Sequence, residues 1–244
     1  MRRVGHKGAD LIAPGNTAAS FEAALAAGVD MIEFDVLSER PDGTGALVLA
    51  HDYADLARRR ANGTLLTLAD GLELFRGEAY AGIELDLDLK LPGYEDRVLE
   101  ALRETGLADR TLISTMEEAS LRHIREVAPA IKLGWSVPRV KRNPFRSPVT
   151  AVPAYALLQV LRRRLPGQVA RALREGRVDA IMANFHVVTP RLVRTVLDAG
   201  GEIYVWTVDD PERIEHLRGL GVTGCISNDP RLLAQPRISQ VAAE

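Results

Sequence analysis

The sequence predicts an α/β fold with a parallel sheet, because apolar, strand-like segments alternate with segments of helical periodicity along the chain. Two architectures fit such an alternation, a closed (β/α)8 barrel and an open doubly wound sheet. The length of 244 residues suits a single barrel, which typically takes about 250 residues. The eight strand-like segments are residues 3–6, 31–36, 83–88, 111–115, 131–136, 179–184, 203–207 and 224–227.

Helical periodicity fills most of the intervals between these strands. Apolar residues recur three and four positions apart in residues 21–27, 98–105, 121–127 and 192–199. Pro190 and Pro211 stand where two helices would begin, and the first turn of a helix accepts a residue that lacks an N–H group. No internal repeat or low-complexity tract breaks this order, so we expect one domain over residues 1–244.

Two connections between predicted strands are longer than the others. Residues 38–45, after the second strand, are rich in turn residues and lead through an apolar segment to His51, so we expect a hairpin arm there. The connection after the fifth strand contains the basic residues Arg139, Lys141, Arg142, Arg146, Arg162, Arg163 and Arg164. It is typical of a loop and an amphipathic helix with a solvated basic face. It also fits a basic lip that makes weak contact with anionic lipid through residues 139–164.

Bulk composition describes an ordinary globular protein. The chain is 46% hydrophobic and 26% charged, which is enough for a large core, and its formal charge of −2 gives no signature of nucleic-acid binding. No apolar run approaches the roughly 20 residues of a transmembrane segment. A single cysteine excludes an internal disulfide, and the N-terminus lacks the apolar run of a signal peptide, so we expect a cytoplasmic protein.

Two predicted strands carry carboxylates on a single face. Alternation puts Glu33 and Asp35 on the same side of the second strand. In the third strand the charged face carries Glu84, Asp86 and Asp88. Carboxylates about 4 Å apart repel by about 4 kcal/mol at an intermediate dielectric, and a divalent cation between them turns this repulsion into binding. Oxygen ligands with no cysteine beside them favour Mg²⁺ or Ca²⁺ over zinc.

Six short motifs occur in the order that is typical of the glycerophosphodiester phosphodiesterases, a family of phosphatidylinositol-phospholipase-C-like barrels. They are His6-Lys7-Gly8, Pro14-Gly15-Asn16-Thr17, Glu33-Phe34-Asp35, His51-Asp52, Asp88-Leu89-Lys90 and Trp206-Thr207-Val208-Asp209. Near the end of the chain, residues 221–230 are similar to the family's closing motif. The resemblance covers nearly the whole chain. It implies a (β/α)8 TIM barrel that hydrolyses glycerophosphodiesters to glycerol 3-phosphate and an alcohol with the help of a divalent metal.

The resemblance also implies roles for individual residues. Glu33, Asp35 and Asp88 would bind the metal, since the acid-x-Lys motif selects Asp88 among the three acids of its strand. His6 and His51 would exchange protons with the reacting oxygens, a task for which an ordinary imidazole pKa of about 6.5 is suited.

The remaining motif residues would contact the substrate. Lys7 and Lys90 would hold phosphate oxygens, and Trp206 would form an apolar wall. Asn16 would either touch the ligand or cap the first helix.

Departures from the family pattern at three positions bear on the chemistry of the site. Lys7 replaces an Arg, Gly15 replaces a Glu, and Asp88 stands where most members have Glu. We interpret the first two as linked, because the loss of an acidic partner would remove the need for an Arg. The departures leave two alternatives open: a lysophospholipase D-like or sphingomyelinase D-like lyase that forms a cyclic phosphate, and a barrel that binds phosphodiesters without turnover.

Overall fold

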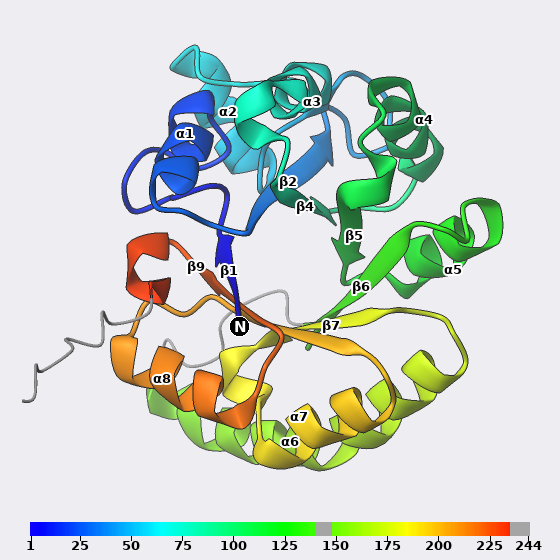
Figure 1. Ribbon diagram of the computed structural model, residues 1–244. Helices are drawn as coiled ribbons and strands as arrows, with labels where there is room; N and C mark the ends of the chain where they lie inside the picture. Colours follow the sequence, from blue (N-terminus) through cyan, green and yellow to red (C-terminus); the bar gives the residue numbers. More distant parts are fainter. Residues whose placement is uncertain (140–147, 235–244) are drawn as a thin grey trace, which may run out of the picture.

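Eight parallel strands close into a barrel in the computed structural model (Figure 1). The structure describes residues 1–139 and 148–234. For residues 148–154 and 156 it describes the backbone alone. The ring closes because β1 pairs with both β9 and β2. The barrel strands are β1 Arg2–Gly5, β2 Met31–Ser38, β4 Glu84–Leu89, β5 Thr111–Thr115, β6 Lys132–Val137, β7 Ala180–Asn184, β8 Glu202–Trp206 and β9 Gly224–Ser227. The predicted barrel is confirmed, and the open doubly wound sheet is wrong.

Helices surround the barrel and connect its strands (Figure 1). They are α1 Ala18–Ala26, α2 Tyr53–Ala61, α3 Leu68–Arg76, α4 Glu95–Thr105, α5 Glu118–Val127, α6 Pro148–Arg174, α7 Pro190–Asp198 and α8 Pro211–Leu220. Short 3-10 turns, among them η4 Phe185–Val187 and η5 Pro230–Leu233, lie in the connections. Pro190 and Pro211 occupy the first turns of α7 and α8, as the sequence predicts. Among the described residues, no helix has both the length and the apolar character needed to cross a membrane.

Both unusual connections are present. The arm after β2 is a hairpin, because β3 Leu47–Val48 pairs antiparallel with the end of β2. The long connection after β6 contains α6, whereas Lys141, Arg142 and Arg146 lie outside the described residues. The barrel spans the described part of the chain, and the assignment of all of residues 1–244 to one domain stays a prediction.

Strand alternation divides the core into two parts. Outside the barrel, Phe34 of β2 packs against Phe21 of α1 and Phe75 of α3, with ring centroids 6.2 and 5.2 Å apart. Inside the barrel, apolar side chains form a plug of Val4, Met31, Leu112, Ala180, Met182, Tyr204 and Ile226. Glu33 and Asp35 of β2 and Asp86 and Asp88 of β4 lie above this plug, towards the carboxyl ends of the strands. We call this end of the barrel the mouth.

Candidate active site

A cavity of about 190 Å³ opens at the mouth of the barrel. One side of it is polar and is lined by His6, Glu33, His51, Asp86, Asp88, Lys90 and Ser114. The other side is mainly apolar and is lined by Met116, Met182, Trp206 and Ile226, together with Ser136 and Thr207. The cavity can therefore hold a ligand that has a charged end and a less polar end.

Three carboxylates converge at the polar side. Asp35 of β2 lies opposite Asp88 of β4 in the sheet, and one oxygen each of Glu33, Asp35 and Asp88 lies within 4.8 Å of the others. The side chain of Asp35 is fully buried, and its Oδ1 has the Lys90 ammonium as a charged neighbour. Carboxylates this close repel one another, and a cation between them offsets the repulsion. These oxygen donors therefore fit a hard divalent cation such as Mg²⁺ or Ca²⁺.

Two lysines offset the negative charge of this cluster. The Lys90 ammonium forms ion pairs with Asp35 and Asp88, and Lys7 Nζ lies 3.9 Å from Asp35 Oδ2. Burial would lower the pKa of Lys90, but the charges of Asp35 and Asp88 outweigh it and raise this pKa well above its ordinary value. Burial, together with the charge of Asp35, raises the pKa of Glu33 well above its ordinary value. Lys90 therefore stays charged beside the cavity at neutral pH.

The two rival acids of β4 have other partners. Asp86 is buried and accepts a hydrogen bond of 2.6 Å from Ser114 Oγ, and burial raises its pKa to about 8. Glu84 lies at the opposite end of the barrel, where Arg2 donates to it at 2.6 Å. Among the acids of β4, Asp88 is thus the one that lies close to Glu33 and Asp35.

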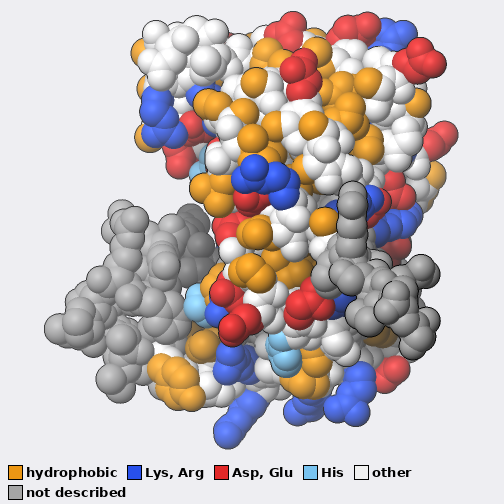
Figure 2. All heavy atoms as spheres, turned by 60° about the vertical axis from the view of Figure 1, so that its left-hand side comes forward, with side chains coloured by type: hydrophobic (Ala, Val, Ile, Leu, Met, Phe, Trp, Pro, Cys, Tyr) orange, Lys and Arg blue, Asp and Glu red, His pale blue; other side chains and the backbone are white. Residues whose placement is uncertain are grey.

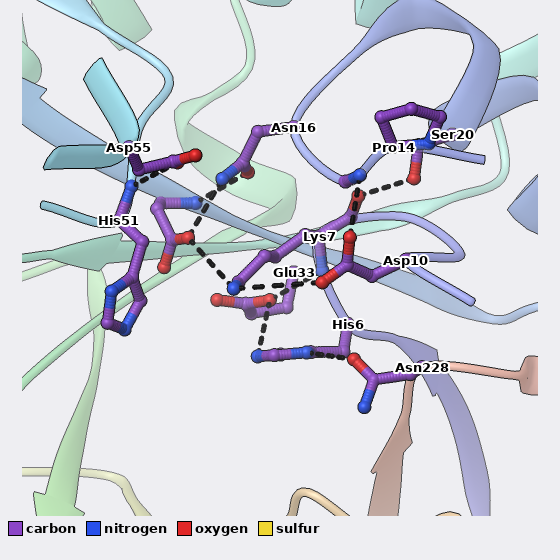
Figure 3. A network of polar contacts seen from close by, with 12 residues as sticks. His6, Lys7, Asp10, Pro14, Asn16, Ser20, Glu33, His51, Asp55 and Asn228 are labelled. Atoms are coloured by element: carbon purple, nitrogen blue, oxygen red, sulfur yellow. Dashed lines mark hydrogen bonds and ion pairs between the residues drawn. The ribbon is translucent and has the colours of Figure 1, made fainter. Parts of the chain in front are cut away.

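A chain of hydrogen bonds sets the orientation of His6. The amide nitrogen of Asn228 donates to Asp209 Oδ2 at 2.6 Å, so the amide oxygen faces His6 Nδ1, 2.5 Å away (Figure 3). Nδ1 must therefore carry the proton, which leaves Nε2 as an acceptor 3.9 Å from Glu33 Oε2. Burial, with a contribution from the charge of Lys7, lowers the pKa of His6 to about 4. This imidazole is neutral and can accept a proton on Nε2.

The hairpin arm brings His51 to the other side of the same cavity. Its side chain is 52% exposed, and its Nδ1 lies 3.2 Å from Oδ2 of Asp52, the N-cap of α2. Its backbone N–H donates to Asp55 at 3.1 Å, and Arg59 donates to the same carboxylate oxygen at 2.7 Å (Figure 3). The backbone of His51 is held, while its ring stays open to the cavity.

The loop after β1 contains an acid that the sequence patterns do not single out. Asp10 Oδ2 lies 3.8 Å from Lys7 Nζ, and Asp10 Oδ1 accepts a hydrogen bond of 2.7 Å from the N–H of Gly15 (Figure 3). A Cβ atom on Gly15 would lie only 2.6 Å from Asp10 Oδ1 and 2.7 Å from Lys7 Cβ. Lys7 therefore has an acidic neighbour in its own loop, and the interpretation that the departures at Lys7 and Gly15 are linked stays a prediction.

Asn16 and Trp206 each form hydrogen bonds with another residue at the site. Asn16 is buried; its amide nitrogen donates to Asp35 Oδ2 at 2.8 Å, and its oxygen accepts from the Asp35 N–H at 3.1 Å. The capping interpretation of Asn16 is wrong, because Thr17 is the N-cap of α1. The indole N–H of Trp206 donates to the Met182 carbonyl at 2.8 Å. Contact of either residue with substrate stays a prediction.

Comparison with known proteins agrees with this arrangement. The sequence matches the model of the glycerophosphoryl diester phosphodiesterase family over residues 6–63 and 57–232. A glycerophosphodiester phosphodiesterase of Caldanaerobacter subterraneus subsp. tengcongensis is 26% identical over 260 residues, which span 94% of this chain and 95% of that protein. A glycerophosphodiester phosphodiesterase of Bacillus altitudinis is 26% identical over 254 residues, which span 92% and 93% of the two chains.

Solved structures share the same fold. An Oleispira antarctica phosphodiesterase, in complex with the product sn-glycerol-3-phosphate, has a TM-score of 0.70 at 20% identity, with 96% of this chain and 95% of that chain covered. A glycerophosphodiester phosphodiesterase from Thermotoga maritima has a TM-score of 0.67 at 20% identity, with 95% and 96% covered. Since the family match spans most of the sequence, the chain belongs to the glycerophosphoryl diester phosphodiesterase family and is an enzyme of this barrel type.

Proposed function

We propose that the enzyme hydrolyses glycerophosphodiesters to glycerol 3-phosphate and an alcohol, and that it depends on a divalent metal. The observation that carries this proposal is one cavity lined by Glu33, Asp88, Lys90 and two imidazoles, with Asp35 and Lys7 beside these groups. The names of the Caldanaerobacter and Bacillus relatives, and the product bound by the Oleispira protein, support the same class of small-molecule substrate.

Charge complementarity supports the binding roles. Glu33, Asp35 and Asp88 would hold Mg²⁺ or Ca²⁺, which in such a site draws electron density from a phosphoryl oxygen. Lys90 and Lys7 would neutralise the non-bridging phosphate oxygens, because their ammonium groups lie beside the same carboxylates. Trp206 would pack against the alcohol part of the substrate from the apolar side of the cavity.

The surroundings of the two imidazoles support different roles for them. His6 would take the proton of the attacking oxygen on Nε2, since Asn228 keeps the proton of the ring on Nδ1. His51 would donate a proton to the departing alkoxide, since its exposed ring lies where an alcohol can leave to solvent. By family resemblance, the attacking oxygen is the neighbouring glycerol hydroxyl, and water then opens the cyclic phosphate.

One assay tests the function. Turnover of glycerophosphocholine, glycerophosphoethanolamine and lysophosphatidylcholine is followed by phosphorus NMR in EDTA, in Mg²⁺ and in Ca²⁺. We expect glycerol 3-phosphate from the first two substrates only when metal is present. Full activity in EDTA would refute the metal dependence. A cyclic phosphate as the final product would identify a lyase, and absence of turnover would favour the alternative of a barrel that binds phosphodiesters without hydrolysing them.

Two further expectations remain proposals. A cytoplasmic location is supported by the single, buried cysteine, which suits a reducing compartment. A single domain is supported by the closure of the barrel between β1 and β9, near the two ends of the described chain.

A further inference from the structure

One helix is far longer than the others. The 27 residues of α6 make a helix about 40 Å long at a rise of 1.5 Å per residue. Arg162 Nε donates to the carbonyl of His186 at 2.9 Å, in the turn η4 that directly follows β7 at the mouth. This contact places Arg162 at the mouth, and about 20 Å of α6 precedes it.

Apolar side chains are exposed at this end of the molecule. On α6 the exposed fractions are 61% for Tyr155, 55% for Leu157 and 44% for Val160. The loop after β1 adds Leu11 and Ile12, and we call these five residues the apolar rim. In the described residues only two other large apolar side chains are exposed, and both lie at the carboxyl ends of helices, away from the mouth. These two are Val127 and Leu197.

Five arginines of α6, α7 and α8 lie on the mouth side of the molecule, where Arg162 donates to the His186 carbonyl and Arg213 stacks on Phe185, 4.3 Å from the ring centroid. Within the part of the chain that the structure describes, none of them forms an ion pair with a carboxylate. They are Arg162, Arg163 and Arg164 on α6, Arg191 in the first turn of α7 and Arg213 in the first turn of α8, and we call them the basic row. Figure 2 shows Lys and Arg side chains along the lower edge of the molecule, the side where Figure 1 places α6, α7 and α8.

We propose that the apolar rim and the basic row dock the enzyme on the surface of an anionic lipid bilayer, with the mouth of the barrel facing the lipid. Exposed apolar side chains next to cations are the combination that enters the interface of such a membrane. The chain as a whole carries a formal charge of −2, so this local excess of arginine is not a general property of its surface. A second copy of the chain would bring one basic row against another, which disfavours a dimer through this face.

Vesicle sedimentation of the full chain tests the docking. The vesicles contain phosphatidylcholine alone or with about 30% phosphatidylglycerol, which supplies the negative charge. Each arginine near an anionic surface contributes about fivefold to the partition coefficient, so Arg163→Glu with Arg164→Glu should weaken binding by roughly 25-fold or more. Leu157→Ser with Val160→Ser should weaken it at least about tenfold through lost insertion.

Matched substitutions at the opposite end of the molecule serve as controls. Val127→Ser with Leu197→Ser and Arg103→Glu with Arg174→Glu change equally exposed side chains away from the mouth, and neither pair should alter sedimentation. The proposal is overturned if the wild-type protein does not sediment with anionic vesicles, if it binds neutral vesicles equally well, or if the control pairs lose as much binding as the rim pairs. A dimer that only the rim substitutions dissociate, without vesicle binding, would also overturn it.

Docking and catalysis are measured separately. The proposal goes beyond the proposed function, because sedimentation requires no turnover and can fail or succeed in a protein without activity. Hydrolysis of water-soluble glycerophosphocholine should be unchanged in the rim variants, which also shows that they are folded. Hydrolysis of lysophosphatidylcholine held in anionic vesicles should fall with binding, if the docked mouth is where lipid substrates enter.

Discussion

Gly15→Ala is a sharp test of how the loop after β1 holds Lys7. The new Cβ atom would lie 2.6 Å from Asp10 Oδ1 and 2.7 Å from Lys7 Cβ, well inside van der Waals contact. Asp10 could move aside only by giving up its hydrogen bond from Gly15 and its approach to Lys7. Lys7 Cβ is fixed close to the backbone, whose N–H donates to Glu33 Oε2 at 2.7 Å.

Overpacking of this kind costs about 1–3 kcal/mol. For a barrel of this size we therefore expect the melting temperature to fall by roughly 4–8 °C at the middle of that range. We also expect KM for glycerophosphocholine to rise about tenfold, which corresponds to about 1.4 kcal/mol of lost phosphate contact. Calorimetry and steady-state kinetics measure the two effects.

Gly82→Ala is the matched control, because a Cβ atom there meets nothing within 4 Å and the backbone φ is not in the left-handed region. This variant should be neutral, or more stable by up to about 1 kcal/mol. If Gly15→Ala matched the control in both melting temperature and KM, packing of the loop would not constrain Lys7, and the reasoning would fail.

The imidazoles, the cation site and the Asp55–Arg59 pair each give a further measurable outcome. His6→Gln or His51→Gln should lower kcat about 10²–10⁴-fold, while thermal-shift titration still detects metal binding; loss of metal binding would make the histidines ligands instead. Mg²⁺ or Ca²⁺ at about 100 times its Kd should raise the melting temperature by roughly 5–11 °C, and Asp35→Asn should abolish this shift. Asp55→Asn should lower the free energy of unfolding at pH 7 by about 3 kcal/mol, because it leaves the buried guanidinium of Arg59 uncompensated. Burial opposes ionisation of Asp55, but hydrogen bonds from Arg59 and the His51 N–H outweigh it and hold its pKa below the ordinary 3.8. The stabilisation is thus complete above pH 3.8 and is lost as pH falls through the lower folded-state pKa. Urea unfolding of the wild-type protein and of Asp55→Asn between pH 7 and pH 2 measures the difference in their free energies of unfolding. A difference that stayed constant over this range would contradict the ion-pair explanation.

Local periodicity was enough to predict the strands and their faces. Alternation in β2 separates Glu33 and Asp35 from Phe34, and the structure has the carboxylates inside the barrel and Phe34 packed outside against Phe75. Such a pattern is local, because the direction of a side chain depends only on its place along the strand. Closure of the barrel is not local, since the same alternation fits an open sheet, and only the family resemblance selected the barrel.

The contacts that orient the site residues depend on closure of the barrel, so they could not be predicted from the sequence. Asn228 lies 222 residues from His6, and the two meet because β1 and β9 are neighbours in the closed ring. Its position directly after the last strand was the available signal, since the carboxyl ends of all strands meet at the mouth. Asp10 falls between two motifs, and no spacing rule indicates that its loop folds back on Gly15.

Formal charges at the site explain why the acids and lysines occur together. When all three are ionised, the carboxylates of Glu33, Asp35 and Asp88 outnumber the ammonium groups of Lys7 and Lys90 by one, so the ionised cluster has an excess of negative charge. A divalent cation would reverse this excess to a single positive charge, and a phosphodiester carries a single negative charge. The ionised cluster therefore attracts a cation, and only with that cation in place does it become complementary to a diester, since a diester without the cation would meet net repulsion. This balance gives a physical reason why substrate affinity should depend on the metal even though no lysine binds the metal itself.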